Sequence, residues 1–382
     1  MASPQPTPSR RLTVMQLLPA LESGGVERST LEVADALVRA GHRAIVVSAG
    51  GRLVPQLLAS GAEHIVLPLG RKSPSTLLHA FALRRLWAEQ GVDLVHARSR
   101  LPAWVGLLAW RGMNEATRPR WVTTVHGLNS PSRYSAVMTR GERVICVSRT
   151  VRDYVLQHYP DTEADKLRII PRGIDPAAFP RAPWPDPQAR AWAAASHPAL
   201  GGDGPLLLLP GRGTRLKGHA DGLQLLADLR AGGRDARLWL PGAREAGREA
   251  YIGEMEQLAQ QLGVADAVAF TAPTDAIARA YAACDLVLQL SRKPEAFGRT
   301  VVEALACGRP VLGWNHGGVG ELLAQLLPGG AVAPFDAQAA HSAACELLTQ
   351  AAPAVDTMGF SLRAMQEATL AVYAELLDVT SN

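Results

Sequence analysis

Cysteine is scarce in this chain, which has 382 residues and only four cysteines, Cys146, Cys284, Cys307 and Cys345. The four lie far apart in apolar stretches, with no CxxC pair and no histidine at the spacing of a metal ligand. This pattern argues against a metal site built on cysteine. We expect these thiols to lie in the core of a protein from a reducing compartment.

Long apolar segments are also absent. The longest run, Leu101 to Trp110, is about half of the roughly 20 residues that a membrane-spanning helix needs. Residues 1–11 are proline-rich and polar, and no apolar region follows their arginines, so we expect a disordered lead-in rather than a secretory signal. Apolar residues still make up 47% of the chain, which is ample for packed cores. These features favour a cytoplasmic globular protein.

Acidic side chains are sparse in the first half of the chain. Residues 1–180 hold 23 basic and 14 acidic groups and the rest hold 16 and 21, so a net charge of +4 hides halves of +9 and −5. A basic half indicates an anionic partner, either a phosphorylated substrate or an anionic membrane face. We expect no nucleic-acid partner, because no arginine-rich helix is interleaved with aromatic stacking residues.

Short apolar runs alternate with helical patterns, and at roughly 100 to 200 residues per domain the length favours two domains. Strand-like runs occupy 12–18, 44–48, 64–67, 93–96, 121–125, 143–147 and 167–170, and then 206–209, 237–240, 267–270, 286–290 and 310–312. Because helical patterns separate most of these runs, we expect an α/β fold with two parallel sheets covered by helices.

Proline and glycine are dense between residues 181 and 204, which disfavours long helices and central strands there. We therefore expect a first domain over 12–180, an interdomain segment over 181–204 and a second domain over 205–352. A last helical pattern lies within 353–382, beyond the second sheet, and is placed to pack back on the first domain.

The loop after the run 206–209 carries candidate phosphate ligands, since ligands of open parallel sheets gather beyond the carboxyl ends of strands. In GRGTRLKG, Arg212 offers a fork and Lys217 a point charge for phosphate oxygens. Lys217 stands out because only four of the 39 basic residues are lysine. A surface loop with two ordinary cations is the alternative, and the spacing is not that of the GxxxxGKS/T phosphate loop.

The segment KPEAFGRTVVEALACG supplies two carboxylates around a helix start. A helix that begins near Gly298 points the free N–H groups of Gly298, Arg299 and Thr300 at an anion. Glu303 lies on the same face about one turn in, where it can accept two sugar hydroxyls, and Glu295 reaches the other side of the anion. The alternatives are helix-dipole complementation for Glu295 and a solvated helical carboxylate for Glu303.

Two loops in the first half carry further candidates. SGGVERS follows the first run, where Gly24 and Gly25 permit close approach of a donor ligand and Glu27 is a candidate acceptor contact; a plain strand-to-helix turn is the alternative. His126 follows the run 121–125 and faces the ligand edge if the sheet is parallel, although lone histidines are more often structural.

Arg98 and Arg100 follow the run 93–96 and suit an anionic acceptor or a lipid headgroup, with a solvated rim as the alternative. In the helical pattern that comes next, Trp104 and Trp110 mark either an interfacial helix or, more commonly, a helix buried against the first sheet.

Together these segments resemble a retaining glycosyltransferase of family 4, with the two-domain GT-B architecture. The resemblance covers nearly the whole chain and rests on SGGVERS, VSRTV at 147–151, IIPRGID at 169–175, GRGTRLKG at 211–218, the pair Glu295 and Glu303, and GGVGE at 317–321. It implies two Rossmann-like domains that face a central cleft. One departure is PRGID, where much of the family has PNGID.

The resemblance also implies roles for the candidate residues. Arg212 and Lys217 would hold the diphosphate of a nucleotide sugar, with UDP as the expected base, helped by the amides of residues 298–300. Glu303 would bind the ribose, Glu295 the donor sugar, and His126 the sugar near the reacting centre. We expect no cofactor and no metal, because fixed cations can replace a metal at the departing diphosphate.

VHARSR and IIPRGID further resemble bacterial enzymes of lipopolysaccharide core assembly, whose acceptors are anionic glycolipids at the inner face of the membrane. This implies a saccharide or glycolipid acceptor, a role in lipopolysaccharide core or other cell-envelope glycan synthesis, and peripheral contact of the basic half with an anionic membrane. Two alternatives stay open: a nucleotide-sugar epimerase on the same scaffold, and a non-catalytic module that binds nucleotide sugars or acidic lipids.

Overall fold

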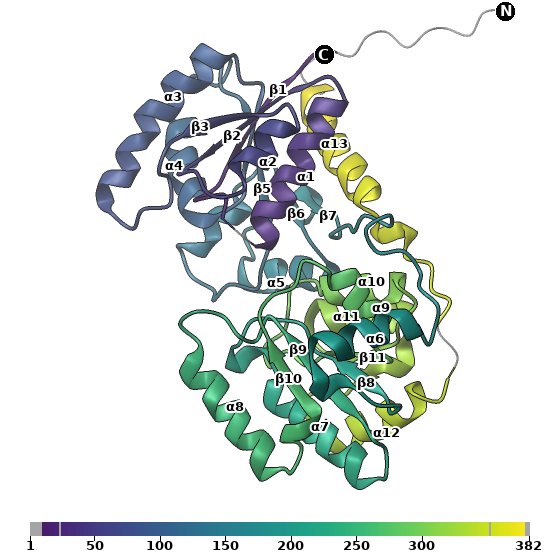
Figure 1. Ribbon diagram of the computed structural model, residues 1–382. Coiled ribbons are helices and arrows are strands. Elements are labelled where there is room, and N and C mark those ends of the chain that lie inside the picture. The colour runs from purple at the N-terminus through teal and green to yellow at the C-terminus, as the bar shows by residue number, and fades with distance from the viewer. Residues whose placement is uncertain (1–9, 23, 351–352, 379–382) are drawn as a thin grey trace, which may run out of the picture. The chain divides into compact units, whose positions relative to one another are not determined.

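The computed structural model describes residues 10–22, 24–350 and 353–378. The chain divides into two units, Met1–Pro171 with Arg363–Asn382 and Arg172–Leu362, and each contains one parallel sheet (Figure 1). The expected α/β fold with two Rossmann-like sheets is therefore confirmed. Of the expected lead-in over 1–11, only Arg10 and Arg11 lie within the described residues.

The first unit is built on a seven-stranded sheet in the order β3-β2-β1-β4-β5-β6-β7. Its strands are β1 Thr13–Leu17, β2 Arg43–Ser48, β3 Glu63–Val66, β4 Leu94–Ala97, β5 Arg120–Val125, β6 Arg143–Cys146 and β7 Leu167–Ile169. Helices connect them: α1 Gly25–Arg39, α2 Val54–Ala59, α3 His79–Gln90, α4 Arg100–Arg111 and α5 Arg149–His158, with short turns η1 Pro74–Leu78, η2 Ser135–Thr139 and η3 Ala164–Lys166. The central strands are buried almost throughout, which explains their continuous apolar runs.

The second unit has a six-stranded sheet in the order β10-β9-β8-β11-β12-β13. Its strands are β8 Leu206–Leu208, β9 Arg237–Pro241, β10 Val268–Thr271, β11 Leu286–Gln289, β12 Val311–Trp314 and β13 Ala331–Val332. Its helices are α6 Pro187–Ser196, α7 His219–Ala231, α8 Glu249–Gln261, α9 Ile277–Ala283, α10 Arg299–Ala306, α11 Gly317–Leu326 and α12 Ala337–Leu347. Short turns are η4 Pro198–Leu200, η5 Arg215–Lys217, η6 Ala265–Ala267, η7 Pro328–Gly330 and η8 Met358–Phe360.

The strand order reverses direction once in each sheet, between β1 and β4 and between β8 and β11. At such a reversal the following loops lead to opposite faces of the sheet and leave a crevice beyond the carboxyl ends of the strands. Arg98 and Arg100, the first residue of α4, follow β4, and Arg212 and Lys217, the last residue of η5, follow β8. The topology therefore places predicted ligand residues at the reversal point of both units.

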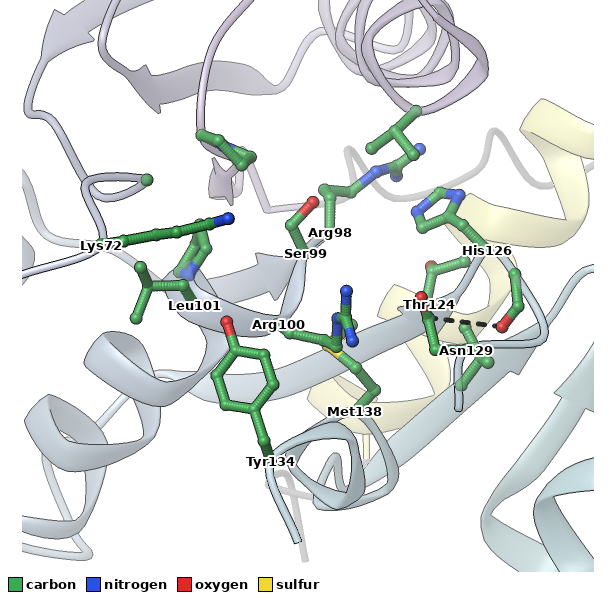
Figure 2. Close-up of a pocket in the computed structure, with 16 residues that line it drawn as sticks. Lys72, Arg98, Ser99, Arg100, Leu101, Thr124, His126, Asn129, Tyr134 and Met138 are labelled. Atoms are coloured by element: carbon green, nitrogen blue, oxygen red, sulfur yellow. Dashed lines mark hydrogen bonds between the residues drawn. The ribbon is translucent and has the colours of Figure 1, made fainter. Parts of the chain in front are cut away.

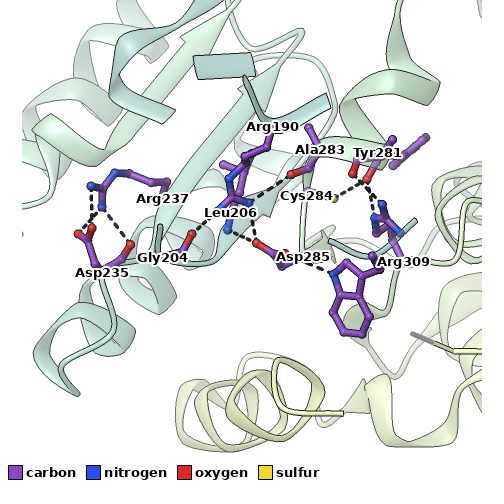
Figure 3. Close-up of polar contacts among 12 residues, drawn as sticks. Arg190, Gly204, Leu206, Asp235, Arg237, Tyr281, Ala283, Cys284, Asp285 and Arg309 are labelled. Atoms are coloured by element: carbon purple, nitrogen blue, oxygen red, sulfur yellow. Dashed lines mark hydrogen bonds and ion pairs between the residues drawn. The ribbon is translucent and has the colours of Figure 1, made fainter. Parts of the chain in front are cut away.

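Residues 181–204 differ from the expected connecting segment, because they lie inside the second unit, which begins at Arg172 rather than near residue 180. Helix α6 forms there with Pro187 in its first turn and Asp186 as its cap, accepting from the N–H of Ala189. Figure 3 shows how Arg190 of α6 is held, through an ion pair of 2.7 Å with Asp285.

A second arginine ties the preceding residues to the same unit. Arg309 is fully buried, and its guanidinium donates to the Tyr281 carbonyl at 3.1 Å (Figure 3). It also donates to the carbonyls of Ala282 and Pro183 at 2.7 and 2.5 Å. Proline density ruled out a long helix but not a short, well-anchored one.

Helix α13, Leu362–Asp378, belongs to the first unit from Arg363 onward, although it follows the second unit in sequence. Its Glu375 accepts hydrogen bonds from Arg143 at 2.7 Å and from Arg168 at 2.5 Å. These bonds lower the pKa of Glu375 to about 2. No helix in the described ranges combines the length and apolar character that a membrane span requires.

Candidate functional site

Lys217 and Glu295 meet at the strand-order reversal of the second sheet. Because β8 and β11 are neighbours, the loops that follow them lie side by side, and Lys217 Nζ is 2.6 Å from Glu295 Oε1. Glu295 also accepts from Ser291 Oγ at 2.5 Å and from Gln289 Nε2 at 3.2 Å. The Lys217 and Glu295 side chains are 29% and 26% exposed, so a ligand can reach both.

Glycine at position 218 makes this approach possible. Gly218 has a φ of 75°, and a Cβ atom there would lie 2.0 Å from the carbonyl oxygen of Leu290, at the end of β11. Only a residue without a side chain can cross the end of the neighbouring strand so closely. The glycine therefore brings Lys217 to Glu295.

Arg212 lies on the same loop but is exposed, and no hydrogen bond or ion pair of its guanidinium is found among the described residues. Arg215, three residues later, is instead paired with Glu254 at 2.6 Å. The structure thus holds one of the two predicted cations, Lys217, against a carboxylate and leaves the other available to an incoming anion.

Helix α10 begins where the sequence predicts. Gly298 precedes it with a φ of 110°, and no side chain caps it. The Val301 N–H donates to the Gly298 carbonyl at 3.0 Å. At a helix start without a side-chain cap, the N–H of Thr300 can receive an anion. A Cβ atom at Gly298 would lie 2.8 Å from Val319 Cγ2 of α11, so the close packing of α10 and α11 also requires glycine.

Glu303 is buried, at 8% exposure, so the alternative of a solvated helical carboxylate is wrong. Its Oε2 accepts from the Tyr281 hydroxyl at 2.9 Å, and its Oε1 lies 3.1 Å from Arg299 Nε, one turn earlier. Burial, followed by the charge of Glu303, raises the pKa of Tyr281 well above its ordinary value, so Tyr281 stays protonated and donates. The two contacts hold the Glu303 carboxylate in one orientation.

One pocket of the first unit, of about 410 Å³, lies beyond the carboxyl ends of β4 and β5 (Figure 2). Its positively charged lining residues are Lys72, Arg98 and Arg100, with His126 beside them. No carboxylate is present among the described residues that line it. This pocket suits a ligand group with negative charge.

Arg98 is the most buried cation of this pocket, with 2% exposure. Burial lowers its pKa to about 10, so it keeps its charge at pH 7. The guanidinium donates to Ser29 Oγ at 2.5 Å and lies 3.4 Å from His96 Nδ1, while its buried Nε has no hydrogen-bond partner among the described residues. The charge of Glu32 offsets part of the effect of burial, although this carboxylate does not line the pocket. An anionic ligand would lower the cost of burying Arg98 further.

Other predicted residues of the first unit are placed differently. His126 lines the pocket, and Arg100 stacks on the ring of Tyr134 with its Cζ atom 5.3 Å from the ring centre. Among the described residues at the start of α1, Val26 lines the pocket, whereas Gly24, Gly25 and Glu27 do not. Ser23, the first residue of that motif, lies outside the described residues.

Several residues of these sites escaped prediction from the sequence. Gln289, Ser291 and Tyr281 orient the two glutamates, and Lys72 and Tyr134 line the basic pocket. Ser291 and Gln289 were detectable in principle as polar residues at the end of an apolar strand. Lys72 was detectable as one of the few lysines.

Two family models match this chain. The model described as Glycosyltransferase Family 4 matches residues 23–178, and the model described as Glycosyl transferases group 1 matches residues 194–358. The chain belongs to glycosyltransferase family 4. The first match includes the described lining residues of the first-unit pocket except Pro19, and the second includes the Lys217–Glu295 pair.

Individual relatives of this family 4 member are distant. A D-inositol 3-phosphate glycosyltransferase of Xylanimonas cellulosilytica is 31% identical over 185 residues, which cover 48% of this chain and 43% of the relative. The chain therefore matches less than half the length of that curated relative.

Solved structures match over nearly the whole length. A glycosyltransferase of Rickettsia africae ESF-5 has a TM-score of 0.80 and 28% identity, covering 96% of this chain and 99% of that one. The Anabaena protein HepE, in complex with UDP and glucose, has a TM-score of 0.77 and 20% identity, covering 95% and 100%. These likenesses establish the GT-B fold for this family 4 member.

Proposed function

We propose that the protein is a retaining, metal-independent hexosyltransferase, which moves a sugar from a nucleoside-diphosphate sugar to an anionic saccharide or glycolipid. The observation that carries this proposal is the arrangement in the second unit. The Lys217–Glu295 pair, Arg212 and the start of α10, which no side chain caps, follow the two strands at the reversal point of one sheet. The Arg212 guanidinium has no partner within the part of the chain that the structure describes. Cations and free amides suit a diphosphate, and the carboxylates suit sugar hydroxyls.

Each group has a role in the proposed donor complex. Arg212, Lys217 and the amides of residues 298–300 bind the diphosphate, and Glu303, held by Tyr281, accepts hydrogen bonds from the ribose. Glu295 accepts from hydroxyls of the donor sugar. His126, on the first unit, contacts the sugar near the reacting carbon.

The proposed reaction proceeds with retention and without a carboxylate nucleophile. Glu295 and Glu303 are both assigned to substrate hydroxyls, so the departing diphosphate helps to deprotonate the acceptor hydroxyl on the same face. Arg212, Lys217 and the α10 amides stabilise the charge that develops on the leaving group. If EDTA abolished turnover and magnesium restored it, metal independence would be wrong.

A thermal-shift series tests the donor assignment. UDP, GDP, ADP and their common sugar conjugates are added to the purified protein in EDTA, and a selective rise in the melting temperature identifies the base. We expect UDP to give the largest rise, as the HepE complex with UDP supports. Stabilisation by anionic lipids alone, with no nucleotide effect, would favour a non-catalytic binding module.

The basic pocket of the first unit supports the acceptor assignment. Lys72, Arg98 and Arg100 supply positive charge without a lining carboxylate, and the relative that acts on D-inositol 3-phosphate is named for an anionic acceptor. The anionic glycolipids that the resemblance to enzymes of lipopolysaccharide core assembly implies as acceptors would fit the same pocket. This assignment is tested by measuring the release of UDP from a UDP-sugar. We expect phosphorylated acceptors to accelerate the release and neutral acceptors to have no effect.

A surface of the first unit supports peripheral contact with an anionic membrane. Leu78 at the end of η1, Phe81 of α3 and Leu108 of α4 are exposed apolar residues. Arg84 links the two helices by stacking on Phe81 and donating to the Leu108 carbonyl at 3.1 Å. Apolar side chains beside arginines suit an interface with anionic headgroups.

Sedimentation with phosphatidylcholine vesicles, with and without phosphatidylglycerol, tests this surface. We expect Phe81→Glu to release the protein from the anionic vesicles. Val66→Glu, at an exposed apolar residue of β3, serves as the matched control. Equal binding of both variants and the parent chain would contradict the assignment.

A further inference from the structure

A buried row of hydrogen-bonded side chains leads from the C-terminal helix to the basic pocket. The Tyr373 hydroxyl of α13 lies 2.7 Å from His96 Nδ1, and His96 Nε2 lies 2.6 Å from Thr124 Oγ1. All three residues are almost completely buried, at 1%, 0% and 1% exposure. Thr124 lines the pocket next to His126 (Figure 2).

The neighbouring Arg98 determines the direction of these hydrogen bonds. Its guanidinium, which can only donate, lies 3.4 Å from the same Nδ1 atom that Tyr373 contacts. Because a donor faces Nδ1, this atom must be an acceptor. A His96 ring protonated on both nitrogens would place a second buried positive charge beside Arg98, which would be costly. Burial raises the pKa of Tyr373, so its hydroxyl stays protonated and donates. His96 is then neutral and carries its proton on Nε2.

This direction has a consequence for Thr124. The Thr124 hydroxyl accepts the proton of His96 Nε2, so its own hydrogen remains to be donated. No other hydrogen bond of this hydroxyl is found among the described residues. A ligand oxygen in the pocket is a suitable acceptor, and negative charge on that oxygen strengthens the bond.

We propose that Tyr373 is a positioning residue of the acceptor pocket, which acts through His96 to orient Thr124 as a hydrogen-bond donor to an anionic ligand oxygen. Arg98, which shares the His96 Nδ1 atom, supplies the positive charge beside that donor. The inference rests on the proposed function for the identity of the acceptor site, and it adds a residue 277 positions away from His96 in sequence.

Nuclear magnetic resonance tests the hydrogen-bond direction without any activity measurement. In protein labelled with ¹⁵N-histidine, the His96 signals are assigned by their loss in His96→Gln. We expect the Nε2–H tautomer in the parent chain and a changed Nδ1 shift in Tyr373→Phe, which keeps the ring and removes the hydroxyl. A proton on Nδ1 in the parent chain would reverse every bond in the row and overturn the proposal.

Calorimetry with two probes, inorganic phosphate and UDP, tests the effect on the pocket. We expect Tyr373→Phe to weaken phosphate binding about threefold to tenfold, the usual range for one neutral hydrogen bond, and to leave UDP affinity unchanged. Thr124→Val should show the same loss, and Thr124→Ser, which keeps the hydroxyl, should restore binding. The serine rescue separates loss of a donor from loss of packing.

Thr369→Val is the matched control, since Thr369 is a buried α13 residue whose hydroxyl donates only within its own helix, to the Met365 carbonyl at 2.8 Å. Equal phosphate affinity in Tyr373→Phe and Thr369→Val would overturn the positioning role. If UDP fails to bind any variant or the parent chain, the proposed function fails instead, while the tautomer result still decides the direction of the row.

Discussion

The two units place their charged residues in opposite ways around similar strand-order reversals. In the second unit both glutamates of the candidate donor site have a cationic partner in contact, Lys217 for Glu295 and Arg299 for Glu303. In the first unit Arg98 is buried with no contacting carboxylate, and none lines the pocket. The difference teaches that both glutamates of the donor site are paired with cations and Arg212 remains for an anion, whereas the described lining of the first-unit pocket carries positive charge with no carboxylate in it.

The largest effect is expected at the donor site of the second unit. Lys217→Ala and Arg212→Ala should each lower turnover by about 100-fold or more, because each removes charge that stabilises the leaving diphosphate. Release of UDP from the donor sugar measures the loss. Arg215→Ala, which removes a neighbouring cation already paired with Glu254, is the control and should keep turnover close to that of the parent chain. Near-normal turnover in Lys217→Ala would refute the assignment.

A second substitution tests the basic pocket of the first unit, whose described lining contains no carboxylate. Arg98→Ala should weaken inorganic phosphate binding by about tenfold or more while UDP affinity stays the same, because a charge-assisted hydrogen bond is lost only in the first unit. Calorimetry measures both affinities. Loss of both affinities together would mean that the two sites are not independent.

A smaller effect is expected at the ribose. Glu303→Gln keeps the shape of the side chain but removes the charge, and we expect about a tenfold weaker UDP affinity by calorimetry. Phosphate binding in the first unit should not change. Unchanged UDP affinity would count against the ribose assignment for Glu303.

The smallest effect concerns how α13 is attached to the first unit. The pKa of Glu375 is lowered to about 2 by its bonds to Arg143 and Arg168, so its stabilisation is present above its ordinary pKa near 4.5 and is lost as the pH falls toward 2. Glu375→Gln should therefore unfold more easily than the parent chain at pH 7, with the difference shrinking below pH 4. Thermal unfolding across this range measures the difference. A constant difference would contradict the assigned ion pairs.

The sequence was sufficient to predict most strands and the second-unit site because both depend on local patterns. Continuous apolar runs mark buried parallel strands, and Lys217, Glu295 and Gly298 each follow a strand or precede a helix. Prediction failed at the short helix α6, whose stability depends on a cap at Asp186 and on the contact of Arg190 with Asp285. These contacts form only in the folded unit.

Hydrogen bonds between residues far apart in the sequence could not be predicted from sequence patterns either. Tyr281 is 22 residues from Glu303, and Tyr373 is 277 residues from His96. No periodicity of strand or helix relates such positions. The burial of Glu303 likewise could not be predicted, since an i,i+4 pair with Arg299 is as compatible with an exposed helix as with a buried one.

The position of α13 in the chain affects the order in which the protein is completed during synthesis. The first unit leaves the ribosome early, yet the helix that supplies Tyr373 and Glu375 is translated after the entire second unit. Until then His96, Arg143 and Arg168 lack their partners on α13. The first unit must wait for about the time needed to translate 190 residues, some 10 to 40 seconds at roughly 5 to 20 residues per second. The pocket that is encoded first is therefore finished last.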